Sequence, residues 1–378
     1  MDFIKGIPKG TLICIVAVYP YDLLAPLCFY RSKCVKSISK QENKEEVAIF
    51  KYLKNQKDAL VPAQRAVQKM KTLRHPHVLS YVGSAEYDDS LMLVTEGCIP
   101  VGIWLQDAAR TLKSSSDSTE SFQQELLWGI KCILEALQFL HNNGFAHNYL
   151  GLHAIFVANN GDWKIGALDL IGTMTTEDDF NFLKIHANLL DKPYIAPERQ
   201  QTLVFTSEAE KSSKVAVGSA ADIFALAHCI QNCYALANLT VPEGLSKYFA
   251  RMLSVDSKRR PTASQLAKCP VFTSENIKLM SSLGDLAALK PAAETLEALS
   301  QLSEKVAILP ASICVFKILP CLARTLQMAS TDFNNRDSRE SCRQVNICVV
   351  EDTRVGQETF SSILYSSEYS FKRTLSFK

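Results

Sequence analysis

Between Gly10 and Gly83 the chain contains no glycine. A loop whose backbone amides approach phosphate groups closely needs several glycines within a short span. Gly6 and Gly10 precede an apolar run and are too few to form such a loop. A glycine-rich phosphate-binding loop is therefore excluded from this part of the sequence.

Two other features are missing. The 12 cysteines include no C-x-x-C pair, so the spacing of a zinc ribbon is absent. The formal net charge is only +2, too small to produce the strong basic field of a DNA-binding protein.

A chain of 378 residues with 47% hydrophobic and 21% charged residues is typical of a folded globular protein. Because a chain of this length does not need disulfides to fold, we expect reduced thiols and a cytoplasmic location. Cys229 and Cys233 are one helical turn apart, and we expect both in the core.

A long uninterrupted apolar run is also missing. Thr11–Tyr30 is apolar with basic residues on both sides, as in a signal anchor. Asp22, Pro20 and Pro26 interrupt it, and Leu12–Tyr19 is too short to cross a bilayer. We expect a strand pair or an atypical N-terminal segment here, and a membrane-anchored adaptor stays as an alternative.

Hydrophobic patterning predicts strands first and helices later. Strands are expected at 45–53, Val78–Gly83 and Ser90–Thr95, with a helix over Ala63–Leu73 that stops before Pro76. The further expectations are a loop at 113–121, an amphipathic helix from Leu126 to Leu140 that ends at Asn142-Asn143-Gly144, a hairpin of Ile155–Ala158 with Trp163–Gly166, a long loop at 171–192, and helices from Gly218 to about residue 329. This order predicts an α+β arrangement in two lobes.

Over roughly residues 45–275 the chain resembles a protein kinase. Six short markers occur in the order and spacing of that family: Leu73-Arg74-His75-Pro76-His77-Val78, Leu93-Val94-Thr95-Glu96, Phe139-Leu140-His141 with His147, Tyr194-Ile195-Ala196-Pro197-Glu198, Ala221-Asp222-Ile223-Phe224-Ala225-Leu226, and Arg260-Pro261. The resemblance implies a two-lobed protein-kinase-like fold with a degenerate N-terminal lobe.

Compared with the kinase pattern, the lysine and the glutamate that form an ion pair beside the nucleotide are both replaced. The kinase strand motif V-A-I-K reads Val47-Ala48-Ile49-Phe50 here, so Phe50 replaces the lysine that holds the phosphates. Lys51 follows and, by strand alternation, points to the other face. Ala66 stands where the family has the glutamate that pairs with that lysine. Both halves of the ion pair are absent.

The catalytic and magnesium-binding residues are missing too. The catalytic loop reads His147-Asn148-Tyr149, so Tyr149 replaces the aspartate that accepts the substrate proton. A phenol with a pKa of about 10 is a poor general base at neutral pH. Ala154 replaces the asparagine that holds magnesium, and Ala167 replaces the first residue of D-F-G. The resemblance thus implies that the chain is not an enzyme, with no catalytic, cofactor or metal residues, and leaves open whether ATP still binds.

The retained positions are those that hold the fold. The resemblance implies that Glu198 and Arg260 form the buried ion pair of the lower lobe, and that Asp222 holds the backbone of the catalytic loop. His147 and His153 are interpreted as structural, with metal binding as the alternative. Asp162 is expected to be solvated in its turn. Thr95 lines either a pocket or a collapsed apolar cleft.

Among kinase-like chains, the sequence is most similar to the SCY-like (N-terminal kinase-like) pseudokinases. The stretches that carry this are Lys71-Thr72-Leu73-Arg74-His75-Pro76, Val94-Thr95-Glu96, His147-Asn148 and Gly161-Asp162-Trp163-Lys164-Ile165-Gly166. After residue 285 a helical pair with Lys317-Ile318-Leu319-Pro320 resembles the start of that family's HEAT-repeat array. The expected domains are an atypical segment at 1–44, a pseudokinase domain at 45–280, a HEAT-like segment at 285–330 and a disordered tail at 331–378.

The resemblance implies an inactive scaffold in vesicle traffic between Golgi and endoplasmic reticulum. The implied partners are coatomer or clathrin-adaptor components, with peripheral association at Golgi or ER–Golgi membranes. One alternative is a tRNA-export adaptor, which the near-neutral charge does not encourage. Another is a divergent active kinase that uses Asp169 or Asp162 with Lys51.

Overall fold

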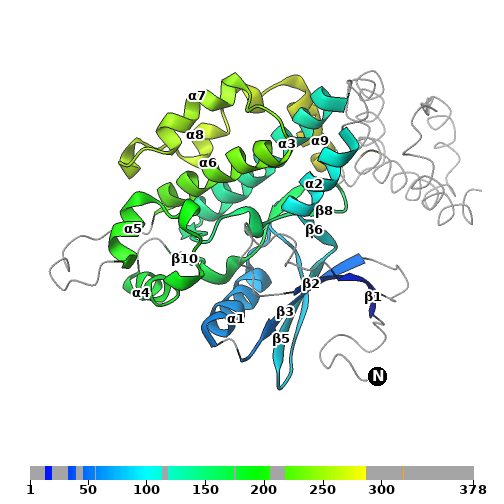
Figure 1. The fold of residues 1–378 in the computed structure, drawn as a ribbon, viewed down its shortest axis with the longest axis vertical. Coiled ribbons are helices and arrows are strands. Elements are labelled where there is room, and N and C mark those ends of the chain that lie inside the picture. The colour runs from blue at the N-terminus through cyan, green and yellow to red at the C-terminus, as the bar shows by residue number, and fades with distance from the viewer. Residues whose placement is uncertain are drawn as a thin grey trace, which may run out of the picture.

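The structure is a computed structural model, and it describes residues 13–18, 33–39, 46–55, 57–112, 118–173, 176–204, 218–286 and residue 318. Figure 1 shows a small lobe built on a sheet and a larger lobe built from helices. The expected α+β, two-lobed fold is therefore confirmed. The expected HEAT-like segment at 285–330 lies outside the described residues, except for residues 285, 286 and 318. The expected tail at 331–378 lies wholly outside them.

The small lobe is an antiparallel sheet with one helix beside it. Its strands β1 (Ile13–Val18), β2 (Lys33–Ser39), β3 (Glu46–Leu53), β4 (Tyr81–Glu86) and β5 (Ser90–Glu96) are arranged in the order β1-β2-β3-β5-β4. Helix α1 (Lys57–Thr72) packs on this sheet through Ala63, Ala66, Val67 and Met70, which are all buried. In the register of β3 with β5, Phe50 lies opposite Leu93.

The larger lobe is built around α3 (Ser118–Asn142) and α6 (Ser219–Leu236). The other helices are α2 (Val101–Leu112), α4 (Glu177–Ile185), α5 (Pro197–Val204), α7 (Glu243–Met252), α8 (Ala263–Leu266) and α9 (Glu275–Leu286). A small sheet of β6 (Cys98–Pro100), β8 (Ile155–Ala158) and β9 (Trp163–Ile165) and a ladder of β7 (Phe145–Ala146) with β10 (Gly172–Thr173) complete this lobe. Apolar side chains of α3 and α6 form the core, and Cys229 and Cys233 are buried there as expected.

The lobes are joined through the segment that precedes β4. The Leu79 amide donates to the carbonyl of Ile165, and the Ile165 amide donates to the carbonyl of His77, both at 2.9 Å. Behind β9, α3 passes very close to Trp163: a Cβ added to Gly129 would lie 2.2 Å from the indole ring. Only glycine lets the helix approach the ring this closely.

Most expected elements occur, with shifted ends. Helix α1 begins at Lys57, before the expected Ala63, because packing of its apolar face outweighs the hydrogen bond that Pro62 removes. The strand expected from Val78 begins at Tyr81, and Val78 forms only an isolated bridge to Ile165. Of the loop expected at 113–121, residues 118–121 are the first turn of α3.

The prediction of a loop at 171–192 was wrong, because helix α4 lies within this range. Its first turn carries Glu177, Asp178 and Asp179, which favour a helix N-terminus electrostatically. Within the apolar segment Thr11–Tyr30, the described residues form strand β1. Among the helices that the structure describes, none is long and apolar enough to cross a membrane.

Candidate functional site

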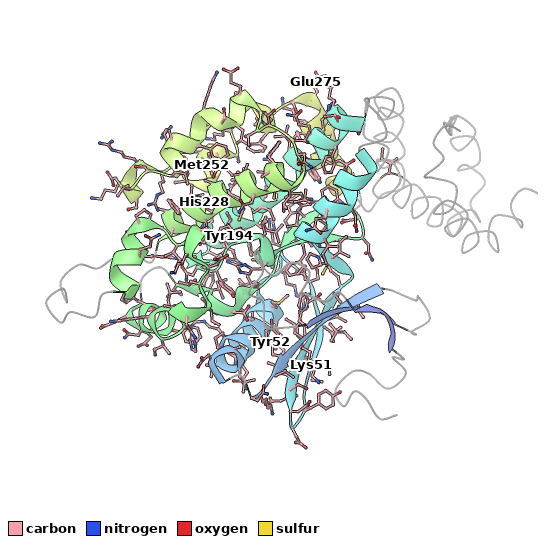
Figure 2. All side chains as sticks on the ribbon, in the orientation of Figure 1. Lys51, Tyr52, Tyr194, His228, Met252 and Glu275 are labelled. Atoms are coloured by element: carbon pink, nitrogen blue, oxygen red, sulfur yellow. The ribbon has the colours of Figure 1, made fainter. Side chains whose placement is uncertain are left out.

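An aromatic pair occupies the place of the kinase lysine. Phe50 of β3 is buried, and its ring contacts that of Phe156 on β8 edge to face, with centroids 5.4 Å apart and planes at 85°. This contact joins the sheet of the small lobe to the sheet of the large lobe. The Nζ of Lys51 instead lies 3.3 Å from Asp89 Oδ2 at the sheet surface, and Figure 2 places this lysine in the small lobe. Its amine therefore does not replace the missing lysine.

The position of the missing glutamate is also apolar. Ala66 is buried against the sheet, and the neighbouring Arg65 forms an ion pair with Asp179 of α4 and covers the Phe182 ring at 4.3 Å. Burial raises the pKa of Asp179, but hydrogen bonds from Thr173 and Arg65 outweigh it and hold this pKa at about 2. Helix α1 is thus tied to α4 through Arg65.

Three further degenerate positions gather in one apolar cluster. Tyr149, Ala154 and Ala167 are buried together with Leu170 and with Leu183 of α4. The Tyr149 ring lies against His153, with ring centroids 4.4 Å apart. A magnesium ion needs oxygen ligands, so this lining does not favour one.

Asp169 does not face an open site. It is buried in the 3-10 turn Leu168–Leu170, against which α1 packs. Ala167 just before it has φ 50° and ψ 51°, in the left-handed region. A magnesium ion shared with a nucleotide would need this carboxylate to reach an open nucleotide site, and its burial in the turn does not favour that.

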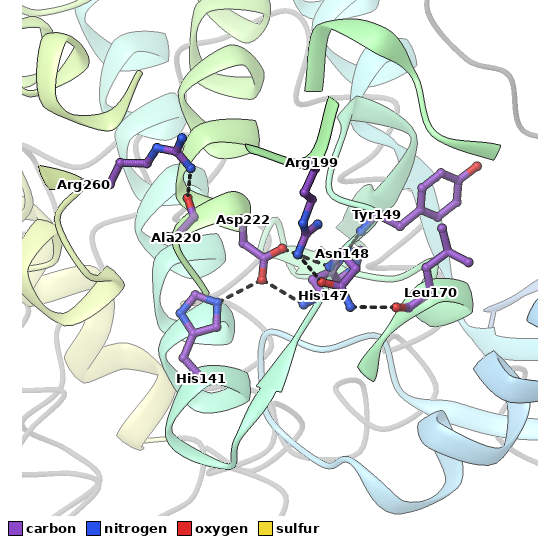
Figure 3. A network of polar contacts seen from close by, with 9 residues as sticks. All are labelled: His141, His147, Asn148, Tyr149, Leu170, Arg199, Ala220, Asp222 and Arg260. Carbon is purple, nitrogen blue, oxygen red and sulfur yellow. Dashed lines mark hydrogen bonds and ion pairs between the residues drawn. The ribbon is translucent and has the colours of Figure 1, made fainter. Parts of the chain in front are cut away.

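The loop around His147 is held from α6 by Asp222 (Figure 3). Asp222 Oδ2 accepts from the His147 amide at 2.8 Å and lies 3.0 Å from His141 Nε2, and Oδ1 accepts from the Asn148 amide at 2.9 Å. Burial raises the pKa of Asp222, but the hydrogen bond and charge of His141 outweigh it, so the pKa is lowered. The carboxylate stays ionised and fixes the loop backbone.

Asn148 extends this network, and sequence reasoning gave it no role. Its φ is 65°, its Nδ2 donates to the carbonyl of Leu170 at 3.0 Å, and its Oδ1 accepts from Arg199 Nη2 at 2.5 Å. Arg199 directly follows Glu198, so a cation beside the A-P-E marker was the available signal. A buried arginine thus reaches the loop from α5 (Figure 3).

Glu198 and Arg260 form a bidentate pair. Arg260 Nη1 and Nη2 lie 2.7 and 2.6 Å from the two carboxylate oxygens. Arg260 also donates to the carbonyls of Ala220 and Ser254, and its side chain is fully buried. The pair links α5 to α6 and to the turn that carries Arg260.

The two histidines of the loop are bonded to backbone carbonyls. His147 Nε2 lies 2.9 Å from the oxygen of Gly166, and His153 Nε2 lies 3.1 Å from the oxygen of Tyr149. Burial lowers the pKa of both rings, that of His153 to about 3. Both are neutral at neutral pH.

Thr95, which was expected to line either a pocket or a collapsed apolar cleft, is buried, and its Oγ1 donates to the carbonyl of Glu96.

The expectation that Asp162 is solvated was wrong. Only 8% of this residue is exposed, and its carboxylate accepts from Trp128 Nε1 and from Asn160 Nδ2, both at 2.8 Å. The Asn-Gly turn indicated an exposed position, and Asn159 and Asn160 are indeed exposed, but Trp128 of α3 covers the carboxylate of Asp162. Lys164, two residues later, donates from its Nζ to both carboxylate oxygens of Glu96, at 2.7 and 2.9 Å.

The chain belongs to the protein kinase domain family, which its residues 31–237 match. It is 24% identical over 324 residues to the "Probable inactive serine/threonine-protein kinase scy1" of Dictyostelium discoideum, covering 82% of this chain and 37% of that protein. It is 26% identical over 288 residues to the mouse "Protein-associating with the carboxyl-terminal domain of ezrin" (75% and 36%), and 24% identical over 326 residues to mouse "SCY1-like protein 2" (75% and 35%). The similarity to SCY-like proteins is confirmed, and the chain spans little more than a third of each relative's length.

Proposed function

We propose that this chain is a catalytically inactive, kinase-like scaffold that binds other proteins. The observation that carries the proposal is the Phe50–Phe156 contact, which puts two packed aromatic rings where a kinase needs a lysine beside the nucleotide. A triphosphate with its magnesium ions requires positive charge and oxygen ligands at that place. Apolar rings supply neither.

The other degenerate positions point the same way. Tyr149, Ala154 and Ala167 form an apolar cluster where the base and the metal ligands would stand. Placing an uncompensated phosphate or metal charge against such a lining is unfavourable. The two nearby aspartates, Asp162 and Asp169, are both buried. Phosphoryl transfer thus lacks its positioning groups as well as its general base.

The residues that stabilise the lower lobe support the scaffold role. Asp222 fixes the loop at His147, and Glu198 with Arg260 connects α5 to α6. A rigid lobe without chemistry is suited to presenting a fixed surface. Among the relatives, one is named as a probable inactive kinase and one for association with the C-terminal domain of ezrin. These names favour protein binding over catalysis.

The finer proposal concerns the partners. We propose a role in vesicle traffic, in the cytoplasm or peripherally on Golgi or ER–Golgi membranes, with coat or adaptor proteins as partners, because the resemblance to SCY-like pseudokinases implies it. A tRNA-export adaptor is the weaker candidate because a net charge of +2 provides little attraction for RNA.

The scaffold proposal is tested by a phosphoryl-transfer assay with purified chain, labelled ATP and Mg²⁺ or Mn²⁺. We expect no transfer above that of a variant carrying Lys51→Met, Asp162→Asn and Asp169→Asn together, because none of these groups is placed for catalysis. Metal-dependent transfer that survives repurification would refute the proposal, and its loss in the folded triple variant would assign the activity to these three groups.

A further inference from the structure

Three potential metal ligands meet behind the lobe junction, away from the degenerate positions. They are His77 in the segment before β4, Cys132 on α3, and Asp162 in the β8–β9 turn. One ligand atom of each lies within 4.8 Å of those of the other two, and all three residues are buried. Two ligands of a tetrahedral zinc ion lie about 3.5 Å apart at the usual bond lengths. Small side-chain adjustments would therefore suffice to surround an ion.

His77 provides a second, independent observation. Its Nδ1 is buried and has no hydrogen-bond partner in the part of the chain that the structure describes. Only 7% of the residue is exposed, so bulk water does not satisfy this nitrogen. A buried polar atom without a partner is costly and unusual. A bound cation would satisfy it.

The other nitrogen of His77 has the arrangement seen around metal-bound histidines. His77 Nε2 lies 3.1 Å from Glu135 Oε2, and Glu135 is held in turn by Lys131 at 3.1 Å. A carboxylate that accepts the Nε2 proton leaves the lone pair of Nδ1 available for a metal. The carboxylate of Glu135 thus selects the tautomer that a ligand needs.

The other two ligands are also oriented. Asp162 accepts from Trp128 Nε1 at 2.8 Å, and Cys132 Sγ lies 3.9 Å from the same oxygen of Asp162. Trp128, Cys132 and Glu135 recur at helical spacing on α3, so one helix face carries a ligand and two orienting groups. The positions of these three groups are therefore set by helix α3.

We propose that His77, Cys132 and Asp162 bind a zinc ion, with Glu135 and Trp128 orienting the ligands and a water molecule completing the tetrahedron. Imidazole, thiolate and carboxylate together suit zinc, since a purely soft set would favour copper(I) and a purely oxygen set magnesium or calcium. Thiolate and carboxylate neutralise the two charges of the ion, which makes burial tolerable once the thiol proton has left to solvent. The ion would join α3, the β8–β9 hairpin and the segment before β4.

The test uses the whole purified chain, refolded with Co²⁺ as a spectroscopic probe and separately with Zn²⁺. We expect one tightly held ion per chain and a thiolate-to-cobalt charge-transfer band. Cys132→Ser and Asp162→Asn should lose the ion, whereas Cys229→Ser, at an equally buried cysteine, should keep it. Glu135→Gln should weaken binding about 10–100-fold without removing a ligand.

Thermal unfolding of the unaltered chain gives an answer that does not depend on variants that fold poorly. Zn²⁺, but not Mg²⁺, should raise the melting temperature by several degrees. Absence of both the cobalt band and this rise would overturn the proposal. Equal metal retention by Cys132→Ser and Cys229→Ser would overturn it too, because the metal would then be bound adventitiously elsewhere.

Discussion

Replacing Glu198 with alanine is expected to lower the free energy of unfolding by about 3–5 kcal/mol. The substitution leaves the fully buried guanidinium of Arg260 without its carboxylate, and breaking a buried pair from one side costs this much. The carbonyls of Ala220 and Ser254 still accept from Arg260 and favour the lower end of the range. Urea unfolding followed by circular dichroism measures the change.

The matched control is the surface pair Glu243–Lys247, whose side chains are 84% and 68% exposed. Glu243→Ala should cost less than about 1 kcal/mol, since exposed ion pairs contribute little. Equal effects of the two substitutions would contradict the structural role given to Glu198 and Arg260.

Phe50→Ala is expected to destabilise the chain by a similar amount, about 3–5 kcal/mol. It removes a buried ring, leaves a cavity beside Phe156, and loses an edge-to-face contact worth about 0.5–1.5 kcal/mol of that total. In a kinase with an open nucleotide site, the side chain at this position would not pack against both lobes. The same urea titration measures the loss.

Val82→Ala in β4 is the comparison for Phe50→Ala, because Val82 is 56% exposed. Its effect should stay within about 0.5 kcal/mol. A loss below about 1 kcal/mol for Phe50→Ala would mean that the ring does not fill the space between the lobes, and the account of the site would be wrong.

The fold was predictable because its signals are local and ordered. The run Val47-Ala48-Ile49 before Phe50 marks β3, and the Asn-Gly turn marks the hairpin of β8 with β9. Short markers at family spacing then set the topology. The missing groups at Tyr149 and Ala154 could be read directly from the catalytic-loop pattern, since the spacing contains no insertion.

What could not be predicted depends on contacts between distant segments. Asp162 is buried because Trp128, on a different element, reaches its carboxylate. Arg199 and Asn148 are 51 positions apart, and no local pattern joins them. Helix α4 was missed because a short polar helix gains much of its stability from partners such as Arg65, which lies on α1. Burial and pairing of this kind appear only once the chain is folded.

The most direct test of the proposal that the chain is inactive and that its nucleotide position is filled is a thermal-shift titration with ATP, with and without Mg²⁺. A ligand at 100 times its dissociation constant adds about 2.7 kcal/mol to stability, which corresponds to a shift of several degrees for a domain of this size. The structure predicts no shift at millimolar ATP under either condition. A clear shift that requires Mg²⁺ would contradict the proposal, because the chain would then bind a nucleotide and a metal ion despite the replacements at Phe50, Tyr149, Ala154 and Ala167.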